Sequence, residues 1–142
     1  MSEQALLGSL FRLAHSLKKQ THQYIEEMDL SIAPMHVRVM KIIQHRAPCT
    51  ANDVVQYLSR DKAQVTRLLK TLLEEDLIKR IPNPNDKRSQ LLSVTSMGEA
   101  IMEQIEDSDR ITFATMTRNL SEQEIAEFQR VATIMAQNLT KQ

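Results

Sequence analysis

The sequence predicts a mainly α protein with one β-hairpin, in the order H-H-H-H-E-E-H-H. Three observations support this fold class: apolar residues recur at helical spacing, only two glycines and four prolines interrupt them, and a strand-like period occurs only around residues 77–94. The chain has 142 residues, of which 42% are hydrophobic. A chain of this size is expected to bury the core of one compact domain without metal ions or disulfide bonds.

The first two helices are predicted from their apolar stripes. Over residues 5–28, leucines recur at helical intervals and form a wide stripe: Leu6, Leu10, Leu13 and Leu17. Ser31 is expected to cap the second helix, which tolerates Pro34 in its first turn. This helix is expected to end near Arg46, and Pro48 closes it.

Capping patterns predict the third and fourth helices. Thr50 followed by Asp53 opens the third helix, which ends near Ser59. Asp61 followed by Gln64 opens the fourth helix, residues 61–74. Valine and leucine line one side of this fourth helix: Val65, Leu68, Leu69, Leu72 and Leu73. Its other side is small, polar and basic.

Residues 77–81 and 91–94 are expected to pair as a hairpin around the turn-rich stretch 82–86. Ser96 with Glu99 then caps a fifth helix that reaches about Met116, and Ser121 with Glu124 caps a sixth that reaches the carboxyl terminus. The apolar stripes of the first and sixth helices exceed what a small helical head could cover, so we expect a partner chain to cover them.

The charge is unevenly distributed along the chain. The net charge is zero, but residues 60–90 hold eight Lys or Arg against five acids, or +3, and the remainder holds 10 − 13 = −3. A neutral chain with its cations gathered in one third can still present a basic face to phosphates.

Two short helices joined by a tight turn and followed by a two-stranded ribbon make a winged helix-turn-helix. On the fourth helix, the residues opposite the leucine stripe or near the amino-terminal end are Lys62, Ala63, Gln64, Thr66, Arg67 and Lys70. Gln suits adenine, Arg suits guanine, Thr suits a thymine methyl or a phosphate, and Lys suits a phosphate. A plain solvated face is the alternative, and the hairpin that follows favours DNA.

The tip of the hairpin carries two cations, Lys87 and Arg88, on a loop stiffened by prolines. Asp86 is placed to pair with Arg88 and to fix its direction. Such a wing can insert Arg88 into a narrow minor groove, where negative potential concentrates. An ordinary exposed turn would have a similar composition, so the loop alone does not decide.

The run from Leu58 to Ile101 closely resembles the signature of the MarR family of bacterial regulators. That family has a recognition helix of the form D-x-x-x-V-T-R-L, a D-x-R wing tip, and L-T-x-x-G before the next helix. Here these motifs read DKAQVTRL at 61–68, DKR at 86–88 and VTSMG at 94–98. The only departure is Val94 in place of Leu, and the order of helices resembles the family over the whole chain.

The resemblance implies a homodimer that binds double-stranded DNA at a roughly palindromic operator and acts as a repressor. It implies one domain over 1–142, with a DNA-binding lobe at 31–96 and dimerisation helices at 1–30 and 97–142. The implied DNA contacts are Lys62, Ala63, Gln64, Thr66, Arg67, Lys70, Asp86, Lys87 and Arg88. Thr50 and Ser59 are added as phosphate contacts near the ends of the third helix.

The resemblance also implies a small aromatic or anionic effector that releases the DNA. Arg12, His15 and His36 are expected to line such a crevice and to hold a carboxylate or phenolate. The simpler interpretation, that these are partly buried polar residues bonded to the backbone, stays open.

Other classes of protein have little support in the sequence. It shows no leader and no run of 18 apolar residues, which indicates a cytoplasmic protein. His15 and His22 lie seven apart, which does not suit chelation of one metal ion. Cys49 has no second cysteine to pair with, and neither an enzyme motif nor a cofactor motif is present. A winged helix that serves only as a protein-interaction module is the competing class.

Overall fold

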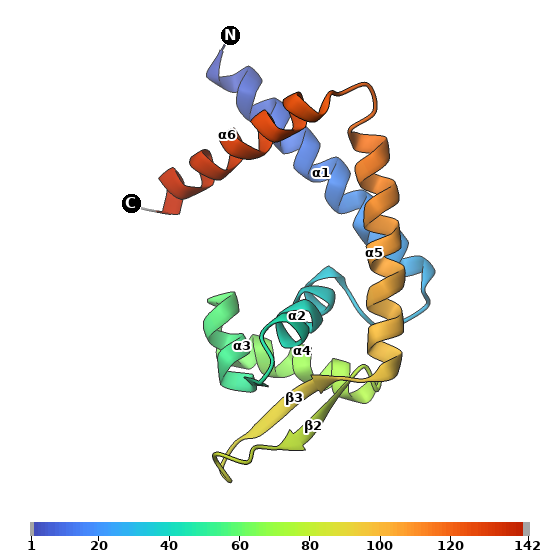
Figure 1. The fold of residues 1–142 in the computed structure, drawn as a ribbon, viewed down its shortest axis with the longest axis vertical. Coiled ribbons are helices and arrows are strands. Elements are labelled where there is room, and N and C mark those ends of the chain that lie inside the picture. The colour runs from blue at the N-terminus through green and yellow to red at the C-terminus, as the bar shows by residue number, and fades with distance from the viewer. Residues whose placement is uncertain (1, 141–142) are drawn as a thin grey trace. The chain divides into compact units, whose positions relative to one another are not determined.

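The computed structural model describes residues 2–140, and its helices and hairpin follow the predicted order (Figure 1). The described elements are α1 (Glu3–Glu27), α2 (Pro34–His45), β1 (Cys49–Thr50), α3 (Ala51–Leu58), α4 (Lys62–Glu74), β2 (Ile78–Pro82), β3 (Gln90–Val94), α5 (Ser96–Met116) and α6 (Glu122–Thr140). They form two compact units, one up to Asp109 and one from Arg110 onward.

The sheet of the first unit has three strands, one more than the sequence predicted. Strand β3 lies in the middle and pairs antiparallel with β2, from Ile78 opposite Val94 to Pro82 opposite Gln90. Its other edge pairs antiparallel with β1, where Cys49 lies opposite Leu92. Two residues are too few to show an alternating pattern, so β1 left no signal in the sequence.

The core of the first unit lies between α2, α3, α4 and the sheet, closed by the end of α1 and the start of α5 (Figure 1). The largest side chains that are fully buried are Ile25, Met40, Ile43, Leu72, Leu77 and Ile78. The predicted inward face of α4 is confirmed at Val65, Leu69 and Leu72. Because these residues fix which side of α4 faces the core, they also fix which side faces out.

Some helices begin as the sequence predicts. Thr50 caps α3 through a reciprocal pair of hydrogen bonds: its Oγ1 accepts from the Asp53 amide at 3.1 Å, and its own amide donates to Asp53 Oδ2 at 2.9 Å. Ser121 and Glu124 make the same exchange at the start of α6. Asp61 caps α4 by accepting from the Ala63 amide at 3.1 Å. These bonds satisfy amides that have no partner within the helix.

Two predicted caps are wrong. The residue that precedes α2 is Ala33 rather than Ser31, because Pro34 takes the first helical position and so fixes where the helix begins. The residue whose side chain caps α5 is Thr95 rather than Ser96: Thr95 Oγ1 accepts from the Gly98 amide at 3.0 Å. At α2 the side chain that completes the cap belongs to His36, whose Nδ1 accepts from the Ala33 amide at 2.8 Å.

Thr95 also joins α5 to the turn between α4 and β2. Its hydroxyl donates to the Asp76 carbonyl at 2.7 Å, and its amide donates to the Leu77 carbonyl at 3.0 Å. Gly98 is buried against the same turn, next to Leu77 and Val94. The first turn of α5 is therefore fixed to the end of α4 and the start of the hairpin.

Apolar side chains remain exposed on both units. On α1 only Ile25 is buried, whereas its leucines and Phe11 face out, with Phe11 70% exposed. In the second unit, no described residue of α6 is buried. The large exposed apolar residues of this unit are Ile111, Phe113, Met116, Leu120, Phe128, Ile134, Met135 and Leu139.

Candidate nucleic-acid interface

The outward face of α4 is polar and basic. All six residues predicted to contact DNA on this helix are exposed: Lys62, Ala63, Gln64, Thr66, Arg67 and Lys70. Ala63, Arg67 and Lys70 lie opposite the buried Val65, Leu69 and Leu72. Gln64 and Thr66 lie at the flanks, and Lys62 is the first residue of the helix. The structure therefore gathers the predicted face on one rigid element that the core holds from behind.

The hydroxyl of Thr66 forms a hydrogen bond within α4. Its Oγ1 donates to the Lys62 carbonyl at 2.8 Å, one turn earlier. Because the hydroxyl proton is used in this bond, the Thr66 side chain has only its methyl group and the lone pairs of Oγ1 left for contact with DNA. A methyl suits contact with the thymine methyl in a major groove better than donation to a phosphate.

The wing tip between β2 and β3 is held by polar side chains of its own loop. Asn83 accepts from the Asn85 amide at 3.0 Å through Oδ1, and donates to Ser89 Oγ at 3.0 Å through Nδ2. These bonds fix the loop that carries Lys87 and Arg88, both of which are exposed.

Asp86 is linked to Arg88 through the backbone. Its Oδ1 accepts from the Arg88 amide at 2.9 Å, and no ion pair joins the two side chains within residues 2–140. The carboxylate thus sets the path of the chain at Arg88 and leaves the guanidinium free to turn outward. The predicted link between Asp86 and Arg88 is therefore made to the Arg88 backbone and not to its side chain.

Positive charge on this lobe is largely uncompensated. All eight Lys and Arg residues between 60 and 90 are exposed. Among them, within the described part of the chain, only Lys70 makes an ion pair, at 4.0 Å to Glu74 on the exposed surface of α4. An exposed ion pair at this distance contributes little to stability. The remaining cations give this surface a positive potential that attracts a polyanion.

Thr50 and Ser59 lie at the two ends of α3. Thr50 lines an open groove between the start of α3 and the hairpin, together with Asn52, Arg80 and Gln90. Ser59 occupies the tight turn into α4 with a left-handed backbone, φ 51°. Arg80 was not predicted; its only signal was a place in the basic run, and the groove forms because β1 brings α3 beside the sheet.

Comparison with known proteins decides the family. The multiple antibiotic resistance protein MarR of Escherichia coli (strain K12) is 31% identical to the chain over 122 residues, which span 84% of this chain and 83% of that protein. The profile of the MarR family matches residues 32–90. The chain belongs to the MarR family.

Solved MarR structures share its architecture. A mutant of E. coli MarR complexed with operator DNA superposes with a TM-score of 0.74 at 28% identity, covering 91% of this chain and 92% of that one. Staphylococcus aureus MepR, solved with DNA, gives a TM-score of 0.79 at 24% identity over 97% and 99% of the two chains, and shows the fold alone. The winged helix predicted from the sequence is thereby confirmed.

Membership in the MarR family fixes the broad function. The chain is a DNA-binding transcriptional regulator, a class without enzymatic activity. Among the helices of residues 2–140, none is long and apolar enough to cross a membrane.

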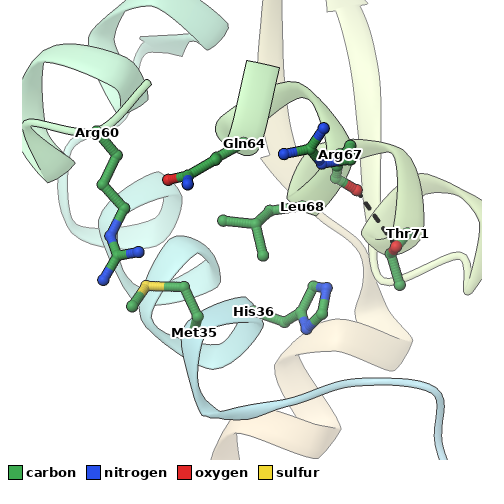
Figure 2. Close-up of a pocket in the computed structure, with 7 residues that line it drawn as sticks. All are labelled: Met35, His36, Arg60, Gln64, Arg67, Leu68 and Thr71. Carbon is green, nitrogen blue, oxygen red and sulfur yellow. Dashed lines mark hydrogen bonds between the residues drawn. The ribbon is translucent and has the colours of Figure 1, made fainter. Parts of the chain in front are cut away.

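The structure separates the three residues predicted to hold an effector in this MarR-family chain. His36 lines a cavity of about 340 Å³ between α2 and α4, together with Arg60, Gln64 and Arg67 (Figure 2). Arg12 and His15 lie on the exposed surface of α1, and neither lines this cavity. Arg12 donates to Ser9 of its own helix at 3.4 Å.

Cys49 is buried in β1, where it pairs with Leu92 of β3. Burial, together with the nearby Asp53 carboxylate, raises the pKa of the Cys49 thiol to about 11. Since the thiolate is the reactive form, very little of it exists at neutral pH. Cys49 is therefore a residue of the buried core.

Proposed function

We propose that the chain is a repressor that binds a roughly palindromic operator as a homodimer. Each subunit lays α4 in a major groove and its wing in the adjacent minor groove, with half-sites about 10 base pairs apart. The observation that carries this proposal is the exposed, largely uncompensated polar and basic face of α4, followed in the chain by a wing that presents Arg88. The operator complex of the 28% identical E. coli MarR mutant supports it.

The proposal assigns residues 31–96 to DNA binding, and residues 1–30 and 97–142 to dimerisation within one MarR-type domain. Its support is the apolar surface that the described chain leaves open, which includes Phe11 at 70% and Ile111 at 69% exposure. Exposed apolar surface on this scale marks an interaction site. A second copy of the chain is the partner that the family relationship favours.

The first experiment selects bound duplexes from a random DNA pool and measures affinity for the enriched sequence across a salt series. A dimeric reader enriches an inverted repeat, and the logarithm of its affinity falls steeply against the logarithm of salt concentration. No enrichment, with weak binding that salt does not change, would favour the competing class, a protein-interaction module.

Dimerisation predicts a clear result for Phe11→Glu. This change places a charge in the exposed apolar stripe of α1 and should shift the protein from dimer to monomer in sedimentation equilibrium. The matched control is Gln23→Glu, which adds the same charge at an exposed position of α1 outside the apolar stripe. If Phe11→Glu stays dimeric at the concentrations where the wild type does, the α1 stripe is not the interface.

The wing predicts a uniform loss of affinity. Arg88→Ala should weaken binding to every duplex by about tenfold and lower the salt slope by about one, because one phosphate-region contact is lost. Lys18→Ala on α1 removes the same charge from an exposed site outside the proposed interface and should change neither quantity. If both variants lost the same affinity, the loss would come from net charge and not from a contact of the wing.

The proposed effector is a small aromatic or anionic molecule that releases the operator. The cavity bounded by His36, Arg60 and Arg67 offers cations and a ring donor to a carboxylate, and it adjoins Gln64 of the recognition face (Figure 2). A ligand shifts the equilibrium only by its differential affinity for the bound and released states. Screening anionic aromatics for loss of binding to the selected duplex tests this step.

A further inference from the structure

The first turn of α2 depends on a titratable side chain. His36 Nδ1 lies 2.8 Å from the Ala33 amide nitrogen, and the ring is half-buried. A backbone amide can only donate, so Nδ1 must be the unprotonated nitrogen and the ring must be neutral, with its proton on Nε2. In the usual capping box this acceptor is Glu or Gln, which stays an acceptor at neutral and mildly acidic pH.

No carboxylate faces this imidazole across the cavity. The charged residues that line the cavity are Arg60, in the turn before α4, and Arg67, on α4 (Figure 2). No titratable side chain from α1, α3, β3 or α5 lines this cavity. Elsewhere on α2, Lys41 forms an ion pair with Asp109 of α5 at 3.7 Å, so the Asp109 carboxylate already has a cationic partner. A proton on His36 would therefore add a third cation beside two arginines.

We propose that His36 is a pH-sensitive positioning residue, whose protonation on Nδ1 breaks the cap of α2 and weakens operator binding by the adjoining α4. The inference rests on the operator binding proposed above. Protonated Nδ1 cannot accept from Ala33, so the start of α2 loses its cap. The same side chain forms one wall of the cavity whose opposite wall is Gln64, Arg67 and Leu68 of α4. Loosening that wall weakens the contact of α2 with α4 and so disturbs the position of the recognition face.

The direction of the pH effect follows from the neutral ring. Burial lowers the pKa of His36 from its ordinary value of 6.5 and outweighs the opposing effect of the Ala33 backbone, which raises it. The folded protein thus binds fewer protons at this site than the unfolded chain does, and stability rises with pH in this window. The contribution of the neutral ring is complete above about pH 6.5 and is lost as the pH falls through the lowered folded pKa.

The experiment compares the wild type with H36Q and H36A on the selected duplex, at about pH 7.5 and at about pH 5.5. Glutamine can accept from Ala33 and does not titrate, so H36Q should bind normally at both values. The wild type should match H36Q at the higher pH and fall below it roughly three- to tenfold at the lower pH, the equivalent of one helix cap. H36A, which has no cap, should bind weakly at both. The other histidines, His15, His22 and His45, are present in all three proteins.

Two results would overturn the proposal. In one, H36Q loses affinity on acidification as much as the wild type does. In the other, the wild type binds more tightly at low pH than H36Q, because a charged His36 then acts as an added cation toward phosphate. If no variant binds any duplex, operator binding itself has failed, and thermal unfolding decides: the melting temperature of the wild type should fall further than that of H36Q on acidification, and equal falls would refute the cap.

Discussion

Gly98→Ala is expected to lower the free energy of unfolding by about 3 kcal/mol, at the upper end of what overpacking costs. An added Cβ would lie well inside van der Waals contact with the Leu77 carbonyl oxygen and 2.7 Å from Val94 Cγ1. The carbonyl cannot move away cheaply, because it also accepts the Thr95 amide at 3.0 Å. Urea unfolding at fixed protein concentration measures the loss, because the proposed dimer would make stability depend on concentration.

The other glycine of the chain supplies the control. A Cβ at Gly8 would lie 3.7 Å from Arg12 Nη1, an ordinary contact on α1. Gly8→Ala is therefore expected to leave stability unchanged or to raise it by up to about 1 kcal/mol, because alanine favours a helix interior. If Gly98→Ala unfolded like the wild type, the close packing of α5 on the turn before β2 would be wrong.

The helix order and the outward face of α4 could be predicted because each depends on residues that are near in sequence. Leucines at helical spacing indicate which side of a helix is buried, and the residues between these leucines must then face out. The wing followed in the same way from turn residues between two short apolar runs. Burial of Val65, Leu69 and Leu72 is the physical link between this pattern and the exposed basic face.

Helix starts were less predictable, because several residues compete for one cap. Ser31 is a better capping residue than Ala33 by type, but Pro34 fixes the start of α2 and the acceptor comes from His36 inside the helix. At α5, Thr95 and Ser96 are adjacent hydroxyls, and the contact with Asp76 selects the threonine. That contact spans 19 residues and leaves no local pattern.

The two grooves beside α4 and the wing could not be predicted at all. The cavity of His36 forms only when α2 packs on α4, which brings the first turn of α2 beside Arg67 of α4 and beside Arg60 in the turn before it. The groove of Thr50 and Arg80 depends on β1 pairing with β3, and β1 has two residues. Neither arrangement has a periodic signal, because each is a product of tertiary packing.

Specificity should separate two neighbouring cations on α4. Arg67→Ala is expected to relax the preference for one base pair in the selected operator by about 1–3 kcal/mol, since Arg reads guanine with two hydrogen bonds. Lys70→Ala should weaken binding to all duplexes alike and lower the salt slope by about one, since Lys acts on a phosphate as a point charge. Both side chains are exposed on the same face of α4, so the two changes remove equal charge from nearly the same place.

The measurement is a repeat of the duplex selection with each variant, together with the affinity of each for the wild-type operator and for single-base variants of it. A loss of preference at one symmetrical pair of positions with Arg67→Ala, and at none with Lys70→Ala, assigns base contact to Arg67. Identical, uniform losses would mean that α4 meets DNA only through phosphates. Sequence preference would then have to come from the wing or from the shape of the duplex, because a uniformly basic helix face carries no base code.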